Sequence, residues 1–169
     1  MLKIINDLWL FFEDCYRRIN VREYAKIMRI SPPTASKILD SYHSENLLSK
    51  EKFRNYLMFY ANKESKQFID LSRIYWGIKL KNLMDFMGSK LTSPTIILFG
   101  SLSKAEAKSD SDVDLAVFAH KKELNISSFE KKIKRKIQVF WFKSIKDIKN
   151  KELSNNIVNG FVLKGRLSL

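Results

Sequence analysis

The fold of this 169-residue chain is constrained most strongly by two short apolar runs. Polar residues follow the first run and lie at the start of the second. The runs are TIILF at 95–99 and VDLAVFA at 113–119, and both have the composition of buried β-strands. Where the second run begins, the chain places Asp110, Asp112 and Asp114. Adjacent carboxylates beside apolar residues cost free energy unless a cation or hydrogen bonds compensate them. A chemical role explains this arrangement better than folding alone.

The rest of the C-terminal half alternates between helix and strand patterns. A polar helix is predicted at 127–136, a third strand at 137–142 and a helical stretch at 143–159, followed by the apolar FVLKG at 161–165. The segment GSKLTSP at 88–94 has the turn chemistry of a domain boundary. These patterns indicate a mixed α/β unit built on a small sheet.

The N-terminal half begins with three predicted helices. Residues 1–19 have apolar residues at helical spacing, and 21–30 form a second, short helix. Ser31, followed by two prolines, is a good N-cap for a third helix over 32–46. The first stripe consists of Ile5, Leu8, Trp9, Phe12, Tyr16 and Ile19.

A hairpin and a long helix follow. Residues 47–61 indicate two strands around a polar turn, because apolar and polar faces alternate there. Residues 64–87 keep apolar side chains near helical spacing and predict a connecting helix.

The order helix, helix, helix, hairpin over residues 1–62, with the phrase ISPPTASKIL, resembles the winged helix-turn-helix domains of archaeal and bacterial regulators. The resemblance implies that the third helix enters the major groove of duplex DNA and that the hairpin meets phosphates. A domain used for protein contacts or dimerisation is the open alternative. The implied DNA-contacting residues are Ser31, Thr34, Ser36 and Lys37 on the helix and Lys50, Lys52 and Arg54 on the hairpin.

The frame LFGS…SDVDLAV resembles the minimal nucleotidyltransferases of the DNA polymerase beta superfamily. The resemblance implies that Asp112 and Asp114 are catalytic residues and ligands of Mg²⁺, since alternate residues of a strand share one face. It also implies that Gly100, Ser101 and Lys104 contact the phosphates of a nucleoside triphosphate. The expected reaction moves a nucleoside monophosphate to an acceptor hydroxyl on an RNA end, a protein or a small molecule.

Two positions depart from the family pattern. Lys104 and Ala105 stand where the family often has Arg-Gly, so a forked guanidinium contact becomes a point charge. Gln138 stands in the third strand, where family members commonly carry a third carboxylate, and an amide cannot act as a base. Either Asp112 and Asp114 suffice with substrate phosphates, or another acid such as Glu152 contributes, or catalysis has been lost.

Composition narrows the choice of partners and compartment. A formal net charge of +13 permits binding of polyanions, although a lysine-rich composition alone would produce it. Cys15 is the only cysteine, so the chain can form neither an internal disulfide nor a Cys/His zinc site with its two histidines. Acidic residues interrupt the apolar N-terminus, which argues against a signal peptide or membrane span. We therefore expect a cytoplasmic protein with no membrane partner.

Together these patterns predict an α+β protein of two domains. A winged helix-turn-helix is expected at 1–62, a linking helix at 63–90 and a small mixed-sheet nucleotidyltransferase domain at 91–169. The leading hypothesis is an Mg²⁺-dependent nucleotidyltransferase. The alternative is a DNA-binding regulator whose second domain senses nucleotide without turning it over, and one half of a toxin–antitoxin pair is compatible with either.

Overall fold

The computed structural model describes residues 2–167, which divide into two compact units. Unit 1 comprises Met1–Ser72 and Ala105–Ser109, and unit 2 comprises Arg73–Lys104 and Asp110–Leu169. The division falls within one long helix, α4 (Lys66–Lys90). Within residues 2–167, no helix combines the length and the apolar character that a membrane crossing needs.

Unit 1 contains three helices and a small antiparallel sheet. The strand order is β1-β3-β2, and β2 pairs with β3 along its whole length. The predicted order of three helices and a hairpin is therefore present. Its elements are α1 (Lys3–Glu13), β1 (Ile19–Asn20), α2 (Val21–Met28), α3 (Pro32–Ser44), β2 (Leu48–Phe53) and β3 (Tyr56–Ala61).

The first helix is shorter than its apolar stripe predicted. It ends at Glu13, and the carboxylate of Asp14 accepts a hydrogen bond from the Tyr16 N–H, which turns the chain away from the helix. Tyr16 is consequently exposed, whereas Ile19 is buried in β1. The prediction that one helix carries all six apolar residues is wrong, because a helix and a strand contribute to the same core.

A buried aspartate joins the three helices of unit 1. The hydroxyl of Tyr42 on α3 donates to Asp7 Oδ2 at 2.8 Å, and the hydroxyl of Tyr24 on α2 donates to the Asp7 carbonyl at 2.9 Å. Ser31 caps α3 as predicted, because its Oγ accepts from the Thr34 N–H at 3.3 Å. The two bonds to Asp7 satisfy polar groups that would otherwise be buried without partners.

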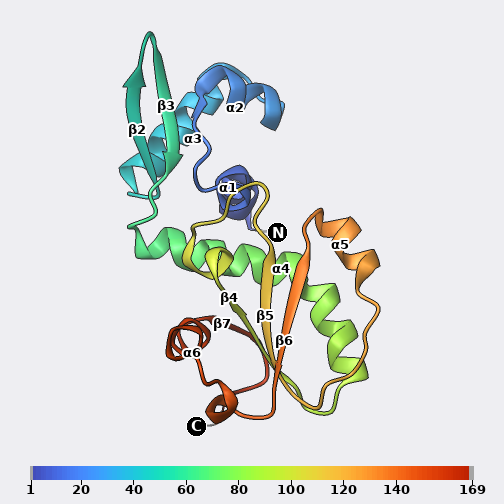
Figure 1. Cartoon of the computed structure of the whole chain (residues 1–169). Helices are drawn as coiled ribbons and strands as arrows, with labels where there is room; N and C mark the ends of the chain where they lie inside the picture. The colour runs from blue at the N-terminus through green and yellow to red at the C-terminus, as the bar shows by residue number, and fades with distance from the viewer. Residues whose placement is uncertain (1, 168–169) are drawn as a thin grey trace. The chain divides into compact units, whose positions relative to one another are not determined.

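Unit 2 is built on a four-stranded mixed sheet of order β6-β5-β4-β7 (Figure 1). Strands β5 and β6 are parallel, while β4 is antiparallel to both β5 and β7. The predicted mixed α/β unit with a small sheet is confirmed. Besides α4, its elements are β4 (Thr95–Phe99), η1 (Ser101–Lys104), β5 (Val113–Phe118), α5 (Ser127–Ile133), β6 (Ile137–Phe142), η2 (Ile145–Asp147), α6 (Lys151–Val158) and β7 (Phe161–Lys164).

One boundary in unit 2 agrees with the prediction and one differs. The long helix ends at Lys90, as predicted for the linking helix, and includes the first residues of the segment 88–94. The helical stretch expected at 143–159 is broken into η2 and α6, because Asn150 caps a new helix by accepting from the Leu153 N–H.

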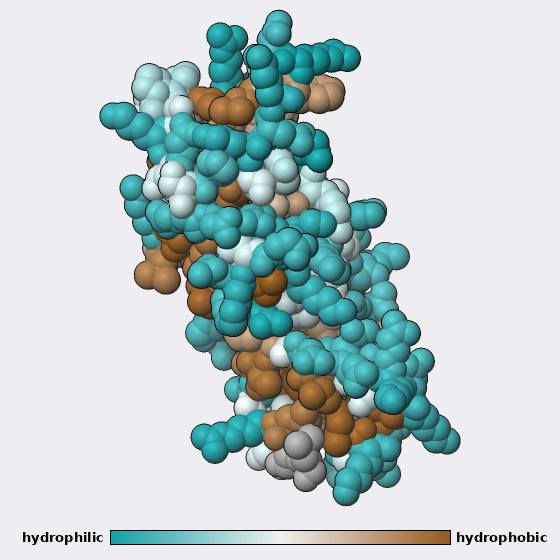
Figure 2. Space-filling view, turned by 90° about the vertical axis from the view of Figure 1, so that its left-hand side faces the viewer, coloured by the Kyte–Doolittle hydropathy of each residue, from teal (hydrophilic) through white to brown (hydrophobic). Residues whose placement is uncertain are grey.

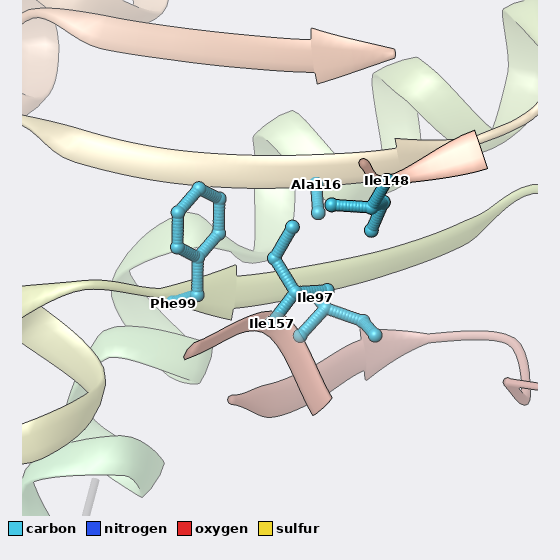
Figure 3. Close-up of a cluster of buried hydrophobic side chains, with 5 residues drawn as sticks. All are labelled: Ile97, Phe99, Ala116, Ile148 and Ile157. Carbon is cyan, nitrogen blue, oxygen red and sulfur yellow. The ribbon is translucent and has the colours of Figure 1, made fainter. Parts of the chain in front are cut away.

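Apolar residues on both faces of β4 and β5 form the core of unit 2. Figure 3 shows five buried side chains that meet on the face covered by η2 and α6. All residues of β4 are buried, so its other face is covered as well, and Figure 1 shows α4 crossing there. The five side chains are Ile97, Phe99, Ala116, Ile148 and Ile157.

One face of the molecule is covered largely by hydrophilic residues. Figure 2 shows them over much of this face, with hydrophobic residues gathered mainly in its lower part. This agrees with a composition of 31 basic and 18 acidic residues. Charge is therefore available on the surface for contacts with anionic partners.

Candidate active site

Pairing of β4 with β5 brings a glycine against a carboxylate. Phe99 is the register partner of Asp114, and Gly100 follows directly with a φ of 72°. A Cβ atom at Gly100 would overlap the Oδ2 atom of Asp114. Glycine is required here both for the left-handed backbone and for the space that the carboxylate occupies.

The turn after Gly100 is held by hydrogen bonds within unit 2. Ser103 is 1 % exposed, and its hydroxyl donates to the Gly100 carbonyl at 2.9 Å. The guanidinium of Arg73 on α4 donates to the Ser103 carbonyl at 2.8 Å. Ser101 begins this turn and is half-buried. The turn, η1, is a short 3₁₀ helix that ends where Ala105 adopts a positive φ of 56°.

Asp112 and Asp114 flank the first residue of β5 and lie on the same face of the strand. Both side chains are half-buried. Burial, and secondarily the charge of Asp112, raise the pKa of Asp114 above its usual range. The two carboxylates are therefore close enough to repel each other, and a bound cation would relieve that repulsion.

Gln138 faces the aspartates, as strand alternation predicted. It is the register partner of Asp114 in the parallel strand β6, and its Nε2 donates to Asp112 Oδ2 at 2.6 Å. In this orientation the amide nitrogen donates a hydrogen bond to the site. The third strand thus supplies a hydrogen bond at the position where a carboxylate would supply charge.

The sequence drew attention to three further charged residues of unit 2. Lys104 is exposed, and its ammonium donates to Asn156 Oδ1 on α6 at 2.8 Å. Asp110 is an exposed turn residue before β5. Glu152 lies in the first turn of α6. Among residues 2–167, no three His, Cys, Asp or Glu side chains group closely enough to hold a metal, so Glu152 does not complete a cluster with the two aspartates.

The donor set at β5 fits a divalent cation that also binds a ligand. Asp112 and Asp114 offer oxygen atoms, which Mg²⁺ prefers, but two side chains fill only part of its coordination sphere. Mg²⁺ usually keeps water or substrate phosphates as its remaining ligands. The arrangement therefore suits a cation that arrives with phosphate groups better than a permanently bound structural ion.

The polar residues that the resemblance placed at a DNA interface are partly engaged within unit 1. Ser31 and Thr34 form the N-cap of α3, with their hydroxyl oxygens 2.8 Å apart. The Ser36 hydroxyl donates to Asp40 at 3.1 Å, and the Lys50 ammonium donates to the same carboxylate at 3.1 Å. These bonds compete with contacts to a partner.

The other three predicted contact residues are cations on the surface of unit 1. Lys37 is exposed on α3, and Lys52 lies on β2. Arg54, at the hairpin turn, stacks its guanidinium 5.5 Å from the ring centre of Phe53. A groove of about 420 Å³ lies beside this turn, and sequence reasoning did not include Arg22, which also lines it.

Sequence reasoning also missed Arg135, a buried cation next to the aspartates. Its guanidinium donates to the Ser111 carbonyl at 2.5 Å and stacks 5.1 Å from the ring centre of Trp76. Arg135 is 7 % exposed although its neighbours Lys134 and Lys136 are exposed. The available signal was the alternation of residues 131–136, in which Ile133 and Arg135 share a buried side.

The raised pKa of Asp114 predicts a change of stability with pH. Because the folded protein holds this proton more tightly than the unfolded chain does, stability falls as pH rises from the ordinary value of 3.8 through the folded pKa. Asp114→Asn removes the charge without changing the shape. In buffers free of divalent cations, the variant should melt at a higher temperature than wild type at pH 7.

Acidification provides the internal check. Below the ordinary pKa of 3.8, Asp114 is protonated in both the folded and the unfolded protein and resembles asparagine, so the difference in melting temperature should shrink. Asp110→Asn, at an exposed position, is the matched control and should leave the melting temperature almost unchanged at both pH values. A destabilised Asp114→Asn protein at pH 7 would show that the carboxylate is favourable where it lies.

Comparison with known proteins identifies a family for the segment that contains this site. Residues 81–166, just over half of the chain, match the family described as Polymerase beta, Nucleotidyltransferase. The matched segment includes Gly100, Asp112, Asp114 and Gln138. No curated protein and no solved structure matches the chain. The chain belongs to the polymerase beta family of nucleotidyltransferases.

Proposed function

We propose that this member of the polymerase beta nucleotidyltransferase family binds a nucleoside triphosphate with Mg²⁺ and transfers its nucleoside monophosphate to an acceptor hydroxyl. One observation carries the proposal: Asp112 and Asp114 share one face at the start of β5, with Asp114 directly beside Gly100. A solvent-exposed pair of aspartates would need no such fit. Two half-buried carboxylates cost free energy, and the binding of a ligand offsets that cost.

Each residue of the site then has a task. Asp112 and Asp114 hold the cation, which when bound neutralises phosphate charge and lowers the pKa of the attacking hydroxyl. Gly100 leaves room for the Asp114 carboxylate at the start of the turn, and Ser101 has a hydroxyl that can donate to phosphates. Lys104 adds a positive charge on the same turn. In the reaction the acceptor oxygen bonds to the α-phosphorus, the bond to the β-phosphate breaks, pyrophosphate leaves and the hydroxyl proton passes to solvent.

Calorimetry tests the binding step. Wild type should bind ATP in the presence of Mg²⁺, and the Asp112→Asn, Asp114→Asn double variant should lose most of that binding because it lacks the charges that hold the cation. Removing Mg²⁺ with a chelator should weaken the wild type in the same way. The control is Asp110→Asn, which changes an exposed acid outside the strand. Equal affinity of wild type and the double variant would remove the pair from the nucleotide site.

A second function is favoured by the hydrogen bond from Gln138 to Asp112. An amide at this place adds no negative charge and cannot accept a proton from the attacking hydroxyl. In this alternative the second domain binds nucleotide without turning it over and regulates DNA binding by the first domain. The two functions share the nucleotide site and differ only in whether a product forms.

Gln138→Asp separates the two functions. If a missing carboxylate limits transfer, the variant should raise the rate of label transfer from an α-labelled triphosphate, because the new side chain lies beside Asp112. Gln138→Asn, which keeps an amide, is the control for the change of shape. If the domain only senses nucleotide, neither variant should form a product. The affinity of the wild type for duplex DNA should then change when Mg²⁺ and ATP are added.

For the N-terminal region we propose a winged helix-turn-helix over residues 1–62 that contacts duplex DNA. The order of helices and hairpin and the exposed cations Lys37, Lys52 and Arg54 support it. The engaged hydroxyls of Ser31, Thr34 and Ser36 leave cations to provide most contacts. Affinity from such contacts comes mainly from the release of counterions and falls steeply with salt.

The salt dependence of DNA binding tests this part. Replacing Lys50, Lys52 and Arg54 by alanine should flatten the log–log salt slope by roughly 2 to 3, since each neutralised phosphate contributes about 0.9. The control removes equal charge from unit 2 by replacing Lys143, Lys146 and Lys149. If both triple variants change the slope equally, or if no duplex binds at low salt, the hairpin is not a DNA contact.

A further inference from the structure

Four lysines gather where α5 ends and β6 begins. Lys131, Lys132, Lys134 and Lys136 are all exposed, and within the described residues none of them pairs with an acidic side chain. We call this set the α5–β6 lysine cluster. Four unpaired positive charges within six residues form a strong local attraction for a polyanion.

The backbone that carries the α5–β6 lysine cluster is fixed by hydrogen bonds. Lys134 ends α5 in the left-handed conformation, and its N–H donates to the Glu130 carbonyl at 2.7 Å. The Glu130 carboxylate accepts from the Ile137 N–H at 2.9 Å. Glu130 forms no ion pair with the four lysines, and its single negative charge leaves the segment strongly positive.

The same segment is tied to the aspartates of the active site. The Lys136 carbonyl accepts from the Val113 N–H at 2.9 Å, and the Arg135 guanidinium donates to the Ser111 carbonyl. Val113 and Ser111 are the two neighbours of Asp112 in the sequence. The lysine-bearing turn therefore lies next to the carboxylate pair at the start of β5 and β6.

We propose that the α5–β6 lysine cluster binds the phosphate backbone of a single-stranded polynucleotide and so presents its terminal hydroxyl as the acceptor. The inference rests on the proposed nucleotidyl transfer and adds the class of acceptor to it. A strand end has both features that the site requires, a hydroxyl at one terminus and successive phosphates behind it. An unpaired strand is favoured because its end is free to enter the site, whereas a paired end is held in the duplex.

Fluorescence anisotropy tests the surface directly. The probe is a labelled 20-nucleotide single-stranded RNA, titrated with the full chain over a range of salt concentrations. The variant replaces the four lysines of the cluster by glutamine. If each contacts one phosphate, the log–log salt slope should flatten by about 3, since a single strand contributes about 0.7 for each contact.

A matched control exists in the same unit. Lys143, Lys146, Lys149 and Lys151 are also exposed, but they follow the opposite end of β6, away from Gln138. Replacing these four by glutamine removes the same charge and should leave the slope nearly unchanged. Equal losses in both quadruple variants would show that RNA responds only to net charge and would overturn the proposal, as would no loss in either.

Further arms identify the strand and its end. RNA and DNA single strands of the same sequence are compared at equal salt, which shows which polynucleotide the protein prefers. If a duplex binds to the cluster more tightly than both single strands, the proposal of a single-stranded acceptor is contradicted. A photoreactive thiouridine at the 3′ end should crosslink to residues 100–138, and one at the 5′ end should not. Crosslinks from the 5′ end alone to that segment would overturn the placement of the acceptor hydroxyl.

These measurements separate this proposal from the proposed function. Asp112→Asn, Asp114→Asn should lose Mg²⁺–ATP binding and keep RNA binding, because the aspartates do not contact the strand's phosphates. If the wild type binds RNA through the cluster and fails to bind Mg²⁺–ATP, the proposed transfer fails while the surface remains. If it binds Mg²⁺–ATP and the cluster variant binds RNA as well as wild type, the acceptor proposal alone fails.

Discussion

The close approach of the Asp114 carboxylate to Gly100 is the contact on which the site depends. It exists because β4 and β5 pair in a register that places Asp114 opposite Phe99, one residue before the glycine. A side chain at position 100 would exclude the carboxylate, and a register shift of one residue would turn Asp114 to the other face. The position of the aspartate pair is thus a property of the strand pairing and not of a flexible loop.

The apolar core offsets the free-energy cost of the carboxylates at the end of these strands. Burial raises the pKa of Asp114, because a charged carboxylate costs free energy at this place. Buried residues on both faces of β4 and β5 supply the favourable free energy that keeps the strands paired. A fold that keeps two repelling carboxylates together is prepared to bind a cation, and Gln138 reduces the repulsion through its hydrogen bond to Asp112.

Much of this arrangement follows from the sequence. The strands TIILF, VDLAVF and IQVFWF, the cap at Ser31 and the side of β6 that Gln138 occupies were all predicted, because each depends on local pattern and strand alternation. The end of α1 at Glu13 was not predicted, since the apolar stripe continues into β1. The contacts of Arg135 with Ser111 and of Lys104 with Asn156 were not predicted either, because they join residues that only the tertiary fold brings together.

The most direct test of the central claim is transfer itself. Purified protein is incubated with Mg²⁺ and each α-labelled nucleoside triphosphate, alone and with total RNA, and the labelled product is located. We expect label to move to an acceptor in the wild type, and we expect Asp112→Asn to abolish the transfer. No transfer from any triphosphate, in both the wild type and Gln138→Asp, would contradict the claim that the aspartate pair is a catalytic site.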